Sequence, residues 1–114
     1  MDKSGRKKQI SDLIESASSK KLLELRDTTD ELDLAILDLL IKRFQIVEQI
    51  NSIKSGLGLD VYDPEREREI IEYVREANKE LSESYIRNIF HRILDESRRF
   101  QNDIEQKKKD SAGL

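Results

Sequence analysis

LLELRDTTDELDLAILDLLIKRFQIVEQINSIKSGL, the segment from Leu22 to Leu57, is predicted to form one long helix on which the rest of the chain is organised. Every third or fourth residue, counted alternately from Leu22, has an apolar side chain at most positions, which is typical of one face of a helix. Arg43 occupies one position of this apolar face, where a cation is unfavourable unless a partner compensates its charge. No Pro or Gly precedes Gly56 in the segment, so the helix is expected to be about 50 Å long.

Composition indicates a single domain of long helices with a thin core. The chain has 114 residues, of which 36% are hydrophobic and 39% are charged. Long amphipathic helices in so short a chain usually complete their burial against a second copy, so we expect an oligomer. Cysteine is absent, which excludes disulfides, thiolate chemistry and Cys-based metal sites. No apolar run is long enough for a membrane span and no signal-peptide pattern is present, so we expect a cytoplasmic protein without a membrane partner.

The distribution of charge argues against nucleic-acid binding by the body of the chain. The net charge is −3, and residues 22–101 carry twelve cations against eighteen anions. Residues 1–21 are richer in lysine, and we expect them to be a polar extension, either flexible or a short helix. A basic arm that binds nucleic acid is the alternative for this extension. We expect residues 107–114 to be a disordered tail, which leaves residues 22–106 as the helical domain.

Two shorter helices are predicted after the long one. Gly56 and Gly58 are stop signals for the long helix. Asp63 followed by Pro64 is typical of an N-cap and a first helical residue, so a second helix is expected from Pro64 to about residue 79. Ser82 is expected to cap a third helix that ends near residue 106.

Two cations of the long helix are spaced so that they can bind one ligand. Arg43 and Lys54 are eleven residues apart, which places them about 16 Å apart along the axis and within roughly 20° of the same direction. Arg26 precedes Arg43 by seventeen residues and lies about 25 Å away and roughly 100° round the helix. Arg26 cannot easily reach the same ligand from the same chain, but it can from a partner helix packed antiparallel.

Polar residues of the two shorter helices complete a candidate binding site. Arg66 and Glu67 stand in the first turns of the second helix, where main-chain amides also bind ligand oxygens. Ser97 and Gln101 are four residues apart, so they project from one face of the third helix. Together with the two cations of the long helix, they predict a pocket for a small ligand with more than one carboxylate. Glu67 leaves room for a ligand hydroxyl.

Each of these residues also has a purely structural interpretation. Arg43 can pair with a nearby carboxylate or extend to solvent, and Lys54 can interact with the dipole at the end of its helix. Asp63 can serve only as a helix cap. Ser97 and Gln101 can be a hydrogen-bonded pair that fixes the register between helices. The occurrence of all these residues together, rather than any one of them, favours a binding site.

Taken as an ordered set, these motifs resemble the all-α class of chorismate mutases. The resemblance spans about 80 residues and rests on LRDTTDELD (residues 25–33), the helix with Arg43 and Lys54, DPEREREI (residues 63–70) and DESRRFQ (residues 95–101). It implies three helices per chain and an intertwined helical homodimer. It also implies two identical sites, each completed by an arginine from the other subunit.

The resemblance assigns a role to eight residues. It implies that Arg26 of one subunit and Arg43 of the other hold the two carboxylates of chorismate, and that Ser97 also contacts a carboxylate. Lys54 and Gln101 would donate hydrogen bonds to the ether oxygen. Glu67 and the main chain near Asp63 would hold the ring hydroxyl, and Arg66 would organise that end of the site. Lys54, Gln101, Arg43 and Glu67 form the catalytic subset of these substrate-binding residues.

The implied function is the Claisen rearrangement of chorismate to prephenate in phenylalanine and tyrosine biosynthesis. Such an isomerase requires no covalent intermediate, and we expect neither a metal nor a cofactor. Two alternatives remain open at this point. One is isochorismate pyruvate lyase, an enzyme with a similar fold and similar cations, and the other is a helical dimerisation module without catalytic activity.

Overall fold

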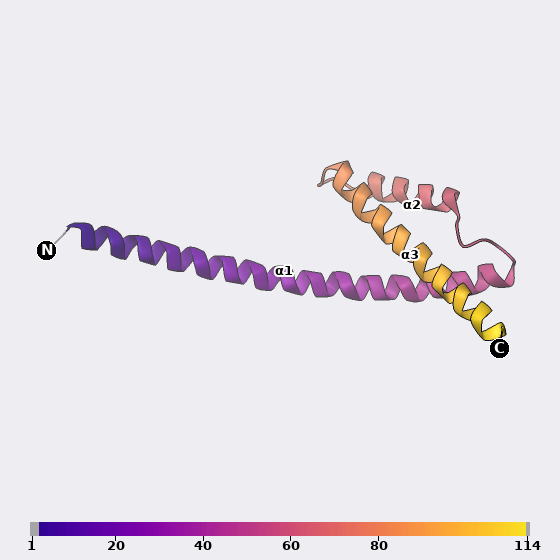
Figure 1. Ribbon diagram of the computed structural model, residues 1–114. Helices are drawn as coiled ribbons and strands as arrows, with labels where there is room; N and C mark the ends of the chain where they lie inside the picture. Colours follow the sequence, from indigo (N-terminus) through magenta and orange to yellow (C-terminus); the bar gives the residue numbers. More distant parts are fainter. Residues whose placement is uncertain (1–2, 114) are drawn as a thin grey trace. The chain divides into compact units, whose positions relative to one another are not determined.

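The computed structural model describes residues 3–113, and within this range it contains three helices and no strand (Figure 1). Helix α1 spans Lys3–Gly56, α2 spans Pro64–Ala77, and α3 spans Glu83–Ala112. The expected all-α class is therefore confirmed. Within the described range, none of the helices has an apolar stretch sufficient to cross a membrane.

The helix ends follow the predicted capping signals. α1 ends at Gly56, and Gly58 then takes a φ of 70°, a conformation that glycine adopts without steric cost. Asp63 caps α2 because its Oδ1 accepts a hydrogen bond from the amide of Arg66 at 3.1 Å, and Pro64 opens the helix. Ser82 is the N-cap of α3, although its side chain makes no capping hydrogen bond.

Two helices are longer than the sequence led us to expect. α1 begins at Lys3, so residues 3–21 continue the helix instead of forming a separate extension. α3 continues to Ala112 through most of the segment that we expected to be disordered. Side chains three and four residues apart support this last part, since Lys108 pairs with Glu105 at 3.2 Å and Gln106 donates to Asp110 at 3.1 Å.

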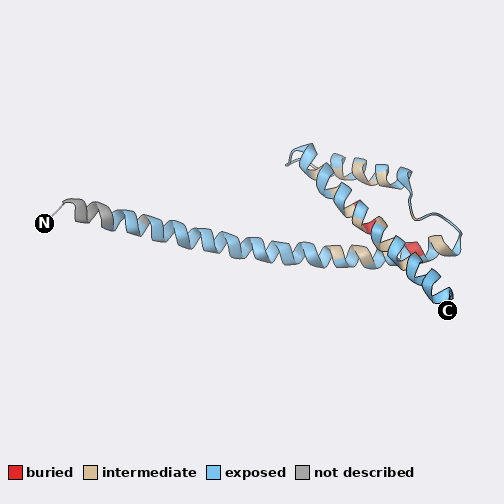
Figure 2. Cartoon of the chain, viewed as in Figure 1, coloured by how far each residue is buried: buried red, intermediate tan, exposed pale blue. Residues whose placement is uncertain are grey.

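The chain divides into two units, residues 1–41 and residues 42–114. The second unit contains the end of α1 together with α2 and α3, and its core is small. Leu94, with 4% of its surface exposed, is the one buried apolar residue in the described part of the chain. Figure 2 shows that most of the described chain is exposed. Phe44 of α1 and Phe100 of α3 meet edge to face, with ring centroids 5.0 Å apart.

The apolar face of α1 remains exposed in this single chain. Leu32 and Leu39 have 59% and 65% of their surface exposed in the first unit, and Ile53 has 64% exposed in the second. Large apolar side chains exposed together are uncommon on a monomeric protein and are typical of an interaction surface. The helix predicted from Leu22 is formed as part of α1, and the single chain does not bury these apolar side chains.

A cluster of polar side chains around the buried Asn51 joins the end of α1 to α3. Asn51 is 2% exposed, and its side-chain amide donates to Glu105 Oε1 at 3.0 Å. Ser55 Oγ donates to the second oxygen of the same carboxylate at 3.3 Å, and Lys108 lies 3.2 Å from the first. The hydrogen bond from Lys108, followed by those from Asn51 and Ser55, holds the pKa of the Glu105 carboxyl below its usual value.

Candidate active site

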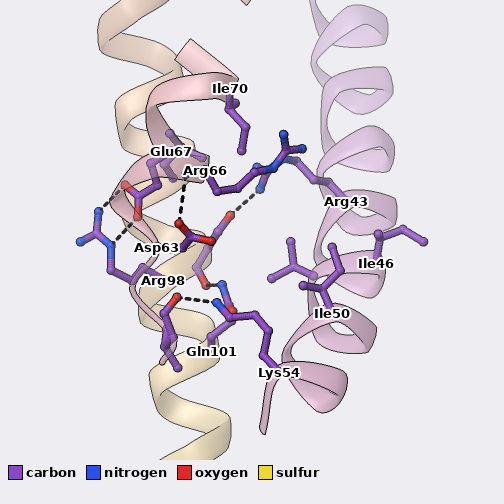
Figure 3. A pocket seen from close by; sticks show the side chains of 14 residues that line it. Arg43, Ile46, Ile50, Lys54, Asp63, Arg66, Glu67, Ile70, Arg98 and Gln101 are labelled. Atoms are coloured by element: carbon purple, nitrogen blue, oxygen red, sulfur yellow. Dashed lines mark hydrogen bonds and ion pairs between the residues drawn. The ribbon is translucent and has the colours of Figure 1, made fainter. Parts of the chain in front are cut away.

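One pocket of about 400 Å³ lies within the second unit, between the end of α1, the loop after it, α2 and α3 (Figure 3). It brings together seven of the eight residues predicted to bind substrate, namely Arg43, Lys54, Asp63, Arg66, Glu67, Ser97 and Gln101. Isoleucine, valine and leucine side chains from the same elements form the apolar part of its wall. A concave site with a few converging polar groups on an apolar wall is typical of a small-molecule pocket.

Arg26 is the predicted residue that does not line this pocket. It is an exposed residue of α1 in the first unit, and it is not among the described residues of the pocket wall. The role of Arg26 at the site of a partner subunit stays a prediction.

Arg43 enters the pocket from α1 as a half-buried cation. Its guanidinium donates a hydrogen bond to Ser97 Oγ on α3. Burial lowers the pKa of Arg43 from its ordinary value, and the nearby charge of Arg66 lowers it further. A lowered pKa means that the surroundings disfavour this positive charge on balance, so an anion that enters the pocket gains a favourable partner.

Lys54 lies in the last turn of α1 and points into the same pocket (Figure 3). Its ammonium donates to the carbonyl oxygen of Val61 at 2.7 Å, in the loop that leads to α2. This bond ties the loop back onto the helix. An ammonium has three donors, so Lys54 keeps hydrogen-bonding capacity for a ligand in this position.

The first turn of α2 contributes three polar residues to the pocket wall. Asp63 is committed to capping the helix through its bond to the Arg66 amide. The guanidinium of Arg66 pairs with Glu69 at 3.2 Å, and both of these side chains are more than half exposed. Glu67 is the least exposed of the acidic residues in this turn, with 24% of its side chain accessible.

Glu67 is held by Arg98, a residue that the sequence did not single out. Arg98 Nε lies 3.0 Å from Glu67 Oε2 and Arg98 Nη2 lies 2.9 Å from Glu67 Oε1, so the contact is bidentate. Arg98 also lines the pocket. In the sequence it is one of two successive arginines in DESRRFQ, and the only local signal is its spacing of three residues from Asp95, with which it also pairs at 3.1 Å.

Ser97 and Gln101 face the pocket from successive turns of α3. Ser97 is 5% exposed and donates its hydroxyl hydrogen to the carbonyl of Ile93 at 2.8 Å, so it accepts from Arg43. For Ser97 to donate to a ligand carboxylate, its hydroxyl must turn away from Ile93. Gln101 Nε2 donates to the carbonyl of Ser97 at 3.2 Å.

The side-chain oxygen of Gln101 has no hydrogen-bond partner in the described part of the chain, although it is buried. A buried acceptor without a donor costs about 1–3 kcal/mol. Two donors are available at this position in principle, the ammonium of Lys54 and a hydroxyl or water that occupies the pocket. The described side chains of the pocket therefore leave one buried hydrogen-bond acceptor unpaired.

The charges of the pocket suit a dianion. Among the described residues that line it, Arg43, Lys54, Arg66 and Arg98 are cations and Asp63 and Glu67 are anions. One pair, Arg98 with Glu67, is closed by direct hydrogen bonds. Arg43 and Lys54, the two cations of α1, line the cavity, and a ligand with two carboxylates would compensate their positive charges.

Comparison with known proteins identifies the family. The model of the family "Chorismate mutase type II" matches residues 25–102. The chain is 33% identical over 84 residues to a chorismate mutase of Methanocaldococcus jannaschii, a match that covers 72% of this chain and 85% of that protein. It is 36% identical over 85 residues to the T-protein of Enterobacter agglomerans, a match that covers 73% of this chain and 23% of the T-protein. The chain thus spans about a quarter of the T-protein.

Solved structures give the same result. The structure of chorismate mutase (form II) from Thermus thermophilus superposes with a TM-score of 0.70 at 31% sequence identity. The alignment covers 72% of this chain and 94% of the Thermus chain. The segment matched by the family model contains all eight residues predicted to bind substrate, since Arg26 and Gln101 both fall within residues 25–102. The chain belongs to the type II family of chorismate mutases.

Proposed function

We propose that this protein converts chorismate to prephenate. The observation that carries the proposal is the convergence of Arg43, Lys54 and Gln101 in one apolar-walled pocket. Chorismate is a small dianion with an enol ether, and these residues offer two cations and an amide to it. The names of the relatives, several of which are chorismate mutases, support the same reaction.

The reaction is a unimolecular rearrangement. The ether C–O bond breaks while a C–C bond forms, and no atom enters or leaves. Such a reaction needs no nucleophile, so the pocket acts by holding the compact conformer in which the two ends meet. Negative charge grows on the ether oxygen as its bond to carbon breaks, and donors placed there beforehand stabilise the transition state.

Lys54 and Gln101 are the donors that we assign to the ether oxygen. They lie on α1 and α3 and flank the same cavity (Figure 3). Lys54 keeps free donor capacity beyond its bond to Val61, and the Gln101 amide has a second N–H beyond the one given to Ser97. Lys54 must remain protonated for this role, because a neutral amine stabilises the developing charge far less.

The remaining assignments concern substrate binding. We propose that Arg43 holds one carboxylate, with Ser97 beside it, and that Arg26 of the partner subunit holds the other. Glu67 accepts a hydrogen bond from the ring hydroxyl near the main chain of Asp63. Arg66 organises this end of the pocket.

A homodimer is part of the proposal, because one chain supplies only seven of the eight residues to its own pocket. The exposed apolar face of α1 supports this assembly, since a second copy is the occupant that would bury it and bring an Arg26 with it. We further propose that the enzyme acts in the cytoplasm in phenylalanine and tyrosine biosynthesis, without a nucleic-acid or membrane partner.

The test is the loss of chorismate absorbance on addition of the purified protein, with the product identified by chromatography. Prephenate at an enzymatic rate supports the proposal. Pyruvate would reassign the protein as a lyase, and no turnover by a folded dimer would reassign it as a dimerisation module. The Arg43→Ala variant, measured at the same concentration, controls for a contaminating mutase from the expression host.

A further inference from the structure

Arg98 and Glu67 form the best-defined ionic contact of the pocket. Each oxygen of the Glu67 carboxylate accepts a separate hydrogen bond from the Arg98 guanidinium, at 3.0 Å and 2.9 Å. The Arg98 and Glu67 side chains are only 32% and 24% exposed. Glu67 stands in the first turn of α2 and Arg98 in the middle of α3. A bidentate pair fixes the plane of the carboxylate as well as its position.

Arg98 is itself held in place from two other directions. Asp95, one turn earlier on α3, lies 3.1 Å from its Nη2. The ring of Tyr62 lies beneath the guanidinium, whose carbon is 5.1 Å from the ring centroid. The hydrogen bond to Glu67 is the largest of the effects that raise the pKa of Arg98 above its ordinary value. The orientation of Glu67 is therefore set before any ligand binds.

This arrangement determines what Glu67 can bind. An ionised carboxylate has about four acceptor positions, of which Arg98 occupies two. The remaining positions can accept from a hydroxyl.

We propose that Arg98 is a positioning residue that orients Glu67 toward the ring hydroxyl of the substrate and so makes the site selective for a hydroxyl-bearing ring. This inference rests on the proposed function, because it takes chorismate as the ligand. It assigns to Arg98 no direct contact with substrate. Its effect on the reaction passes through Glu67.

The experiment compares two substrates across matched variants. Arg98→Gln removes the charge and the bidentate geometry, and Arg98→Lys keeps the charge without the planar fork. Arg92→Gln is the control, since Arg92 lies on the same helix in an ion pair of 2.9 Å with Glu96 and its side chain is 74% exposed. The substrates are chorismate and its analogue in which hydrogen replaces the ring hydroxyl.

We expect Arg98→Gln to lower the catalytic efficiency on chorismate much more than on the analogue without the ring hydroxyl. Arg98→Gln should lower kcat/KM for chorismate about tenfold or more, as expected for disturbing a hydrogen bond to a charged group, and should change kcat/KM for the analogue by less than about threefold. Arg98→Lys should recover part of the loss, and Arg92→Gln should match the wild type on both substrates. Melting curves of all the variants establish that they are folded under the assay conditions.

A double-mutant cycle tests whether Arg98 acts through Glu67 or independently of it. In the Glu67→Gln background, Arg98→Gln should cost little more, because the residue through which it acts is already changed. Equal losses on both substrates, or an undiminished loss in the Glu67→Gln background, would overturn the inference while leaving the mutase assignment intact. A wild-type protein that does not convert chorismate would overturn the proposed function and this inference with it.

Discussion

Arg43 on α1 donates a hydrogen bond to Ser97 on α3, and this contact joins the two helices at the point where the pocket opens between them. Ser97 is almost completely buried, and its own hydroxyl donates a hydrogen bond to the carbonyl oxygen of Ile93. The guanidinium is thereby fixed by a neutral acceptor that leaves its charge uncompensated. That charge is what a substrate carboxylate would meet.

Removal of either α1 cation should abolish most of the activity. We expect Arg43→Ala and Lys54→Ala each to lower kcat at least about 100-fold, the loss typical of removing one preorganised donor from an oxyanion site. Steady-state kinetics with chorismate gives the values, and circular dichroism gives the helical content. Lys79→Ala, at an exposed position between α2 and α3, is the control and should retain full activity. Losses below about fivefold in both variants, far short of the expected effect, would contradict the assignment.

Two inactive variants should regain activity when they are mixed, if the site is shared between subunits. Arg26→Ala and Arg43→Ala should each be inactive, but a mixed dimer has one site in which both arginines are present. Random exchange of subunits in equal amounts makes about half of the dimers mixed, so about a quarter of the sites should be intact. Activity after mixing and re-equilibration is the measurement. No recovery, with exchange demonstrated by differently tagged chains, would rule out a shared site.

A transition-state mimic should stabilise the protein against heat. A bicyclic dicarboxylate at about 100 times its Kd contributes about 2.7 kcal/mol through binding to the folded state alone, which corresponds to a rise in Tm on the order of 10 °C. Differential scanning fluorimetry measures it. Arg43→Ala should show little of this rise, and a protein without a dicarboxylate site should show none.

The cluster around Glu105 should make stability depend on pH. The pKa of Glu105 is held below its usual value in the folded protein, chiefly by Lys108 and then by Asn51 and Ser55. Because the folded pKa lies below the unfolded one, the contribution of Glu105 is fully present above the unfolded pKa of about 4.3 and is lost as the pH falls through the folded value. Glu105→Gln should therefore lower Tm at about pH 7, where the wild-type carboxyl is ionised.

Measuring the Tm of wild type and Glu105→Gln over a range of pH provides the control for this prediction. The difference in Tm between wild type and Glu105→Gln should shrink as the pH falls below about 4, since the wild-type carboxyl then becomes neutral as well. Asn51 can still donate to the amide oxygen of the variant, but an NH2 group replaces the oxygen that accepts from Ser55. Only the part of the difference that changes with pH therefore reports the charge. A difference that stays constant from about pH 7 to about pH 3 would show that the carboxylate charge has no part in stability.

Much of this fold could be predicted because its signals are local. Asp63 and Pro64 mark a helix start through their own backbone chemistry, and Gly58 marks a helix end because it adopts positive φ. Capping acts over three or four residues, which a sequence displays directly. The extension of α1 to Lys3 and of α3 to Ala112 was missed because these terminal segments are polar, and helix propensity is a sum of many weak contributions that no single residue displays.

The pocket could be predicted in part for a different reason. The two cations of α1 that line it, Arg43 and Lys54, share one face by helical geometry, so their joint position follows from their spacing in the sequence. The contact between Glu67 and Arg98 joins residues 31 positions apart on different helices. Its existence depends on how α2 and α3 are rotated against each other, which periodicity does not specify. The pair of Asn51 and Glu105, 54 positions apart, was missed for the same reason.

Burial, and then the nearby charge of Arg66, lowers the pKa of Arg43, and this pair of cations also acts on the ions of the surrounding solution. Two like charges beside a cavity attract whatever anions the buffer contains, and mobile ions screen such charges over about 10 Å at about 0.1 M ionic strength. Chloride and phosphate should therefore compete weakly with a dicarboxylate. If the protein converts chorismate as proposed, its KM should rise with ionic strength while kcat changes little, so the Michaelis constant should be stated with its salt concentration.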